Sequence, residues 1–532
     1  PVRNMLNLQR QPEARRSSGL LHLRATHLLD PSMFYQLEAS LYEQERSFFD
    51  PVFEETFLLY NDSTAVAGLS DAFTPYASQG TAPRPYDFFG FPFARPGTPT
   101  SFGNGSERAS FYSVEEDTYY GLAASITKQA KSHQLKLGLD YQRWTSRRYM
   151  VLLNSIRAAI RSTYPNLEAV YERYHAGDFP QDALLDELLA AAATAPAGEG
   201  DLEDFRSLVR QSSRADFYGF DQFGRRRRGE GLEAPRRPVL AAAYVQDKIE
   251  YGDLILNAGL RWDYFDVDSF RFVDPAAPVR LARENDIDLA SMRPTRTFIE
   301  FSPRLGLSFP VSERTAFHVQ YGRFAQMPKL RDMFTGGAAL SLEVAGGRFI
   351  AFPTAFDVEP IRTTQYEIGL GHQFARTASF DLTGFYRDVR GQLQVRRQEV
   401  TQNAVDAAAY NYLANGDFAT TKGVELVFRL RRVRRLQASL SYTLADARGT
   451  GSAINSGIAG IENDANLPTV LSPLEFSETH RGSANLDYRF GAGDGGALLQ
   501  RSGVNLLLRF SSGHKFTLAT GSVGQRGPEL GA

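Results

Sequence analysis

Apolar and polar residues alternate with a period of two along many segments of this chain. In the clearest segment Leu254, Leu256, Ala258, Leu260, Trp262 and Tyr264 alternate with Ile255, Asn257, Gly259, Arg261, Asp263 and Phe265. Because successive side chains of a β-strand point to opposite faces, one face of this segment is apolar and the other is mostly polar. The run is also long enough to cross a bilayer when tilted. Such segments are therefore predicted to be half-buried strands and not helices.

The same alternation recurs in roughly fifteen segments of the chain. Further examples lie at 135–142, 366–371, 380–386, 424–430, 436–444, 484–490 and 504–510. A water-soluble β-sandwich also alternates in this way, so the pattern alone leaves both fold classes open.

The connections between the strands favour a membrane barrel. Short links at 251–253, 311–313, 375–377 and 432–434 alternate with long segments at about 46–109, 152–236, 266–297, 325–360, 388–418 and 446–475. An up-and-down barrel of the outer membrane has all its short turns at the periplasmic end and all its long loops outside the cell. We therefore predict an all-β, transmembrane antiparallel barrel over residues 1–532, located in the outer membrane of a Gram-negative bacterium.

Two of the long segments have a distinctive composition. Residues 46–109 are rich in Pro, Gly and aromatic residues, among them the run at 88–93, which resists regular structure and could form a ligand-facing cap. Residues 152–236 contain a helical stripe of leucines at 184–189, and Asp201 followed by Asp204 marks the start of another helix. We expect a small helical insert in this extracellular loop.

Composition excludes several other classes of protein. The net charge of −2 gives no basic surface for a nucleic-acid partner. The chain has no cysteine, so disulfides and thiolate chemistry are excluded. No stretch approaches 18 uninterrupted apolar residues, so only strands could cross a membrane. Pro1 does not begin an export signal, and we expect any such signal to lie outside this sequence.

No catalytic motif is present, and we predict that the protein is not an enzyme. The sequence has no GxSxG elbow, HExxH pair or Walker loop; an outer-membrane hydrolase would need a Ser-His pair on one side near the rim. Gly491, Gly493 and Gly496 satisfy GxGxxG, but with strands on both sides they are interpreted as a periplasmic turn without a following helix. No cofactor is expected. Asp263, Asp266, Asp268 and Asp274 could hold calcium in a loop, although their spacing is not that of a dedicated site.

Alternation also selects candidate functional residues. Polar residues expected to face the lumen, where they would contact a ligand or a plug, are Arg261, Asp263, Gln320, Glu367, Asp381, Glu425 and Arg429. Aromatic residues expected in the girdles at the membrane interface are Trp144, Trp262, Tyr264 and Tyr442. The run at 225–228 is all arginine; it could grip an anionic ligand or lipopolysaccharide phosphates, but a solvated face is the commoner role for such a run.

Several segments between about 239 and 515 resemble TonB-dependent outer-membrane receptors. They include AYVQDK at 243–248 followed by NAGLRWD at 257–263, and further stretches at 301–306, 321–324, 359–360, 366–369, 385–389, 415–416 and 422–426. The stretches SYTLADARG at 441–449 and THRG at 479–482 resemble the Oar-like group in particular, whose members usually carry a carboxypeptidase-regulatory-like domain before the plug.

The resemblance implies a barrel of 22 strands filled by an N-terminal plug, in which TonB pulls on a short box ahead of the plug to drive import. Neither plug nor box is recognisable in this sequence, and the Gly-rich end at 531–532 differs from the usual aromatic strand end. The implied partners are the lipid bilayer, lipopolysaccharide, the TonB complex and an unknown ligand, with peptides or proteins favoured by the Oar-like features; a surface lipoprotein or other subunit could cover the loops. The alternative function is a passive channel or a structural adhesion barrel.

Overall fold

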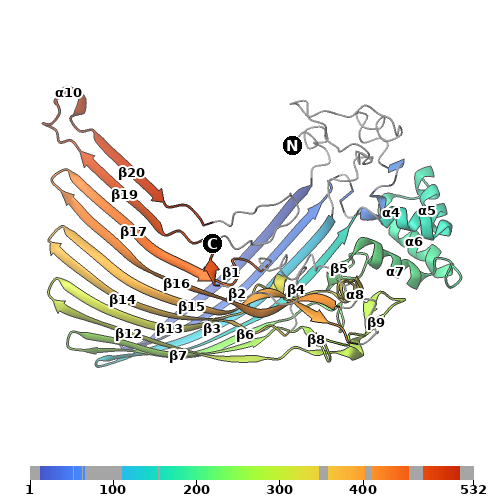
Figure 1. Cartoon of the computed structure of the whole chain (residues 1–532), viewed down its shortest axis with the longest axis horizontal. Coiled ribbons are helices and arrows are strands. Elements are labelled where there is room, and N and C mark those ends of the chain that lie inside the picture. The colour runs from blue at the N-terminus through green and yellow to red at the C-terminus, as the bar shows by residue number, and fades with distance from the viewer. Residues whose placement is uncertain are drawn as a thin grey trace.

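The computed structural model describes residues 12–51, 53–54, 56–60, 62, 64–65, 111–153, 156–346, 357–401, 409–454 and 471–515. Its main element is a 16-stranded antiparallel sheet, curved into a trough (Figure 1). All strands of this sheet except β5 (Asp216–Tyr218) and β18 (Ser472–Pro473) follow one meandering path in chain order. The predicted up-and-down arrangement is confirmed.

The strands of this path are long enough to cross a bilayer, and several of them, such as β15 with 22 residues, continue well beyond it. They are β1 (Glu13–Asp30), β2 (Met33–Phe49), β3 (Phe111–Ala130), β4 (His133–Leu152), β6 (Val239–Tyr251), β7 (Leu254–Asp266), β12 (Phe298–Ser312), β13 (Thr315–Gln326), β14 (Ile361–Ala375), β15 (Ala378–Glu399), β16 (Ala409–Val433), β17 (Leu436–Gly449), β19 (His480–Arg489) and β20 (Gly503–Ser511). Within the described ranges, the recorded strand pairs end at β1 and β20 and do not join these two edges.

Short and long connections are sorted to opposite ends of the sheet. Two-residue turns close the hairpins β1–β2, β3–β4, β6–β7, β12–β13, β14–β15 and β16–β17. Lys131, Gly252 and Arg434 have φ values of +54°, +57° and +54°, as tight hairpin turns require. The opposite ends of these strands carry the longer connections, and those of β2, β3 and β4 lie beside the helices (Figure 1).

The structure corrects the predicted long connection at 388–418. Strand β15 continues to Glu399 and β16 already begins at Ala409, so the connection spans only 400–408. A β-bulge interrupts the alternation there: Gly391 has a φ of +76° and the register to β16 shifts at Gln392. Beyond the bulge the apolar residues move from even to odd positions, and Leu393, Val395 and Leu413 are buried in a cluster at the loop end.

The turn between β19 and β20 differs from the expectation too. Residues Gly496–Leu499 form the four-residue helix α10 inside this connection, although the sequence indicated no helix there. Gly495 and Gly496 both have positive φ, which allows the chain to reverse before the next strand.

The helical insert between β4 and β5 contains four helices: α4 (Ile156–Thr163), α5 (Pro165–Ala176), α6 (Leu184–Thr194) and α7 (Leu202–Ser213). The Asp201 side chain accepts a hydrogen bond of 2.8 Å from the backbone N–H of Asp204, which caps α7 as its sequence predicted. Leu184 and Leu188 of the predicted stripe are fully buried. Among the described residues, no helix is long and apolar enough to cross a membrane.

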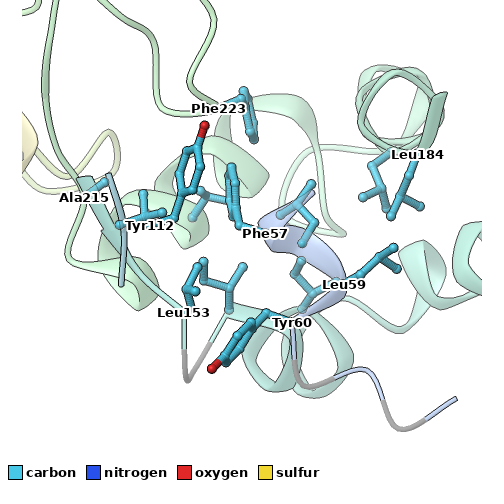
Figure 2. Close-up of a cluster of buried hydrophobic side chains, with 14 of the residues drawn as sticks. Phe57, Leu59, Tyr60, Tyr112, Leu153, Leu184, Ala215 and Phe223 are labelled. Carbon is cyan, nitrogen blue, oxygen red and sulfur yellow. The ribbon is translucent and has the colours of Figure 1, made fainter. Parts of the chain in front are cut away.

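The largest buried core lies at the loop end and not between the strands. It joins the insert to the ends of β2–β4 and to the 3-10 helix η2 (Phe57–Leu59); Figure 2 shows Phe57, Leu59, Tyr112 and Leu184 converging in it. Smaller elements complete this end: β8 (Phe270–Phe272), β9 (Arg280–Leu281), β10 (Asp286–Ile287), β11 (Met292–Pro294), α8 (Gly337–Gly346), η3 (Gln181–Ala183), η4 (Leu289–Ser291) and η5 (Leu330–Asp332).

Candidate functional site

One face of the sheet is apolar and exposed over its whole width. Leu139, Ile368 and Leu506 are 61%, 54% and 58% exposed although they lie in the middle of strands. Water would disfavour so large an apolar surface, whereas the hydrocarbon core of a bilayer accepts it. The opposite, polar face is therefore the one that lines the interior.

All seven residues predicted to face the lumen lie on the polar face. Side chains of directly paired residues in an antiparallel sheet share a face. The registers across β7, β12, β13, β14, β15 and β16 place on that face Arg261, Asp263, Gln320, Glu367, Asp381, Glu425 and Arg429.

A cavity of about 620 Å³ opens on the polar face. Strands β4, β6, β7, β12, β13 and β14 contribute its walls, and three of the predicted residues, Arg261, Gln320 and Glu367, line it. Gln320 and Glu367 are direct neighbours on β13 and β14. Tyr244 and Phe324 add aromatic walls, so the cavity combines apolar surface with a few polar groups, as ligand sites do.

Two glycines create the space for these aromatic walls. A Cβ at Gly138 would lie 2.2 Å from Cζ of Tyr244, and one at Gly322 would lie 3.0 Å from the Phe324 ring. Only glycine lets the rings cover these backbone positions. The guanidinium of Arg304 lies 4.7 Å from the centre of the Phe324 ring, close enough for a cation–π contact.

Charges on the polar face are paired with one another. Arg261 Nη1 donates to Asp140 at 2.8 Å, and its Nε donates to Asp263 at 2.7 Å. Arg429 donates to Asp381 at 2.8 Å on the neighbouring part of the wall. These contacts hold the side chains upright on the sheet and leave a wall of mixed charge.

Three of the four predicted girdle residues lie on the apolar face. Trp262 meets Phe301 edge-on, with ring centres 6.4 Å apart, and Tyr264 lies one step further along the same face. Tyr442 pairs with Gly482 and stacks on Phe510, 6.3 Å away. Their placement agrees with the alternation along their strands.

The structure corrects the prediction that Trp144 belongs to the girdle, because Trp144 lies on the polar face. It pairs with Tyr119, and its indole Nε1 donates to Gln142 at 3.3 Å. Alternation along β4 in fact assigns Trp144 to the face of Lys136 and Asp140, since these residues are separated by even numbers. The girdle role was inferred from residue type, which is weaker evidence than position.

The arginine run at 225–228 is largely engaged in ion pairs. Arg225 pairs with Asp186 of α6, Arg226 with Glu116 of β3 and Arg227 with Glu233. These ion pairs hold the segment between β5 and β6 against helix α6 of the insert and against strand β3 of the sheet. The run therefore stabilises the loop end, and no anion site is inferred from it.

The four candidate calcium residues have separate partners instead of converging, and Asp263 pairs with Arg261. Asp266 accepts from the backbone N–H of Asp268, Asp268 from that of Arg237, and Asp274 from that of Ala276. In the part of the chain that the structure describes, no three acidic or histidine side chains gather in a group that could hold a metal ion.

The comparison with protein families agrees with this architecture. The family profile described as "TonB dependent receptor-like, beta-barrel" matches residues 55–525 of the 532. The chain belongs to the TonB-dependent receptor family. Members of this family are transporters and not enzymes, and the sheet is accordingly the wall of an outer-membrane β-barrel. No curated protein sequence matches the chain.

Solved structures similar to this receptor chain share little sequence with it. They include the FrpB iron transporter of Neisseria meningitidis (14% identity, TM-score 0.45, 91% of this chain and 49% of that chain). The outer-membrane transporter YddB of Escherichia coli has 11% identity and a TM-score of 0.48 over 90% and 49% of the two chains. The ferric yersiniabactin receptor FyuA of Yersinia pestis has 9% identity and a TM-score of 0.42 over 93% and 53%. This chain thus spans about half the length of these receptors.

Sequence reasoning missed much of the receptor's interior surface. It did not identify Tyr244 or Phe324, because the alternation there was judged by polar residues only. A signal was available: Gly138 and Gly322 stand opposite aromatic side chains. The predicted aromatic run at 88–93 lies outside the described residues.

Proposed function

We propose that this receptor binds a ligand at the end of the long connections and imports it through the barrel with energy supplied by TonB. The observation that carries the proposal is the division of the sheet into an exposed apolar face and a polar face that bears the 620 Å³ cavity and paired charges. A wall of this kind suits a water-filled or plugged interior. We further propose that the seven predicted residues on the polar face contact the plug or the ligand.

The insert at 152–236 is proposed to stand outside the cell, and the two-residue turns in the periplasm. This chain contains no cysteine, so single cysteines can be introduced as Arg228→Cys in the connection after α7 and Asp253→Cys in the β6–β7 turn. Both positions are exposed. A membrane-impermeant maleimide should label Arg228→Cys in intact cells, and Asp253→Cys only after the outer membrane is permeabilised. Labelling in the opposite order would contradict this orientation.

The role of TonB is tested separately. Native mass spectrometry of the purified receptor identifies a co-purifying ligand, whose accumulation is then measured in cells with and without TonB. Import requires accumulation that is lost when TonB is removed. Accumulation that continues without TonB would instead support the alternative of a passive channel, and no accumulation at all would support an adhesion or structural barrel.

The Oar-like assignment is also a proposal, supported by the stretches at 441–449 and 479–482. These stretches lie on β17 and at the start of β19, which are paired neighbours in the sheet. The assignment favours peptides or proteins as ligands. The ligand recovered by mass spectrometry tests it directly.

A further inference from the structure

A continuous apolar row crosses the polar face where alternation leads one to expect polar side chains. In register across the first four strands, Leu20 pairs with Tyr42, Tyr42 with Tyr119, and Tyr119 with Trp144. Because directly paired residues share a face, these four side chains form one row across β1, β2, β3 and β4. Adjacent strands are about 4.8 Å apart, so the row is about 14 Å long.

The three aromatic rings of the row are in mutual contact. Tyr119 and Trp144 have ring centres 4.6 Å apart, Tyr42 and Tyr119 are stacked at 5.4 Å, and Tyr42 meets Trp144 edge-on at 6.3 Å. A Cβ at Gly121 would lie 3.1 Å from the Tyr119 ring, so the glycine gives this ring its space. The three rings are half-buried, which leaves part of each ring surface accessible.

Neither packing nor lipid explains this row. The buried clusters at the loop end do not include these residues. The lipid-facing side of the same strands carries other residues, such as Tyr120, which follows Tyr119 directly and is 60% exposed. An accessible aromatic surface in the interior therefore has no structural partner among the described residues.

Hydrogen-bonding rows run along both sides of the aromatic row. On the side of the long connections lie Ser18, Gln44, Asp117 and Ser146; on the side of the turns lie His22, Ser40, Gly121 and Gln142. Several of these groups are already oriented: Arg16 donates to Gln44 at 2.7 Å, and His22 and Ser40 are 3.0 Å apart. Amide, hydroxyl and carboxylate groups dominate, and only one of them, Asp117, is a carboxylate.

We propose that this row, Leu20–Tyr42–Tyr119–Trp144, is a stacking platform for the sugar rings of a neutral saccharide ligand. A pyranose ring presents flat C–H faces, which pack on aromatic rings, and a rim of hydroxyl groups, which pair with amides, hydroxyls and carboxylates. An anionic ligand would instead favour several cations that point at the rings, whereas Arg24 and Arg46 pair with Glu38 and Glu115, and Arg16 donates to Gln44. The inference rests on the proposed import function, to whose path it assigns a ligand class, and it competes with the Oar-like assignment, which favours peptides or proteins.

Two matched pairs of substitutions separate the two faces of the wall. Tyr119→Ala removes a ring from the platform, whereas Tyr120→Ala removes the next ring in sequence from the apolar face. Trp144→Ala and Trp262→Ala form the second pair, and these are the two tryptophans of the chain. Retention of the heat-modifiable band in electrophoresis shows that each variant is folded.

The test is binding of the full-length receptor, purified in detergent, to an array of neutral oligosaccharides. We expect at least one oligosaccharide to bind, with its affinity lowered about tenfold or more by Tyr119→Ala and Trp144→Ala and little changed by Tyr120→Ala and Trp262→Ala. Binding should also protect the fluorescence of Trp144 from quenching by acrylamide. This is the part of the fluorescence that Trp144→Ala removes. The proposal is overturned if no sugar binds, if only peptides bind, or if the variants on the two faces behave alike. It is also overturned if Trp144 is shielded from acrylamide before any ligand is added, because the row is then covered by protein.

This experiment does not involve TonB. If sugar binding depends on the platform but uptake continues without TonB, the proposed function is refuted and the platform proposal stands. TonB-dependent uptake of a ligand that does not use the platform would refute only the platform.

Discussion

Replacing Arg157 should release the helical insert from the barrel. Arg157 lies on α4 with a side chain that is 7% exposed. Its Nε donates to Asp62 at 2.7 Å, its two Nη atoms donate to Glu168 of α5 at 2.8 and 2.7 Å, and its guanidinium lies 3.6 Å from the centre of the Tyr171 ring. His175 also contacts Asp62, at 2.9 Å. One side chain thus connects α4, α5 and the segment that leads away from β2.

The free-energy cost of replacing Arg157 follows from the burial of its partner Asp62. The Asp62 side chain is only 3% exposed, so Arg157→Ala leaves a buried carboxylate whose remaining partners are His175 and the backbone N–H groups of Thr64 and Ala65. Removing one member of a buried ion pair costs about 3–5 kcal/mol. At 1.4 kcal/mol per factor of ten, opening of the insert should become about 10²- to 4×10³-fold more frequent.

Hydrogen exchange of α4–α7 in the purified receptor measures this opening. Arg157→Met keeps much of the packing on Tyr171 but removes the charge, so it should behave like Arg157→Ala. Arg161→Ala is the matched control, because Arg161 lies on the same helix and is exposed. Adding Asp62→Asn to Arg157→Met should restore much of the protection, since no buried charge then remains unpaired. If Arg157→Met exchanges as slowly as Arg161→Ala, the ion pair does not hold the insert and the reasoning is wrong.

Three further predictions concern the two faces and the response to acid. Leu260→Arg, in the middle of the apolar face, should destabilise the receptor in lipid vesicles by about 2–4 kcal/mol, whereas Asn257→Arg on the polar face should cost far less in the same urea titration. Gly138→Ala should cost about 1–3 kcal/mol because Tyr244 covers this position, and a second change, Tyr244→Ala, should relieve most of that loss in the same measurement. Burial would raise the pKa of Asp62, but the N–H of Ala65 and the guanidinium of Arg157 outweigh it and hold this pKa below 3.8. The contribution of Asp62 to the stability of the insert should therefore be present above pH 3.8 and be lost progressively below it, as followed by circular dichroism. Asp62→Asn should weaken this dependence and leave the part that comes from Glu168, whose pKa is also lowered, chiefly by its hydrogen bond from Arg157.

Much of the wall could be predicted from sequence, because each strand obeys a local rule. The alternation at 254–265 depends only on the residues of one strand. It correctly placed Trp262 on the apolar face and Arg261 on the polar face. The cap at Asp201 is equally local, since it depends on a residue only three positions away. Tight turns such as the one at Gly252 were recognised for the same reason.

Features that depend on long-range packing could not be predicted. The ion pairs of Arg225 and Arg226 join residues 39 and 110 positions apart, and no pattern in the sequence matches these partners. The strand extensions around Leu393 and Leu413 are out of phase with the rest of their strands, because the β-bulge at Gly391 shifts the register and the loop-end cluster buries the shifted residues. Their assignment to a loop was wrong for that physical reason.

The aromatic row shows how a proposed binding surface can depend on register alone. Tyr42 and Tyr119 are 77 positions apart in sequence, and each by itself is an isolated aromatic residue on a polar strand face. A slip of one residue in either strand would send its ring to the lipid side, because the side-chain period of a strand is two. The two-residue turns at 31–32 and 131–132 fix the register within each of the hairpins β1–β2 and β3–β4. These turns therefore align Leu20 with Tyr42 and Tyr119 with Trp144. The two pairs meet only through the register between β2 and β3. That register is set over the whole length of both strands by the alternation itself. The local pattern that builds the barrel wall thereby also assembles, from residues that no local pattern could select, a surface suited to a ligand.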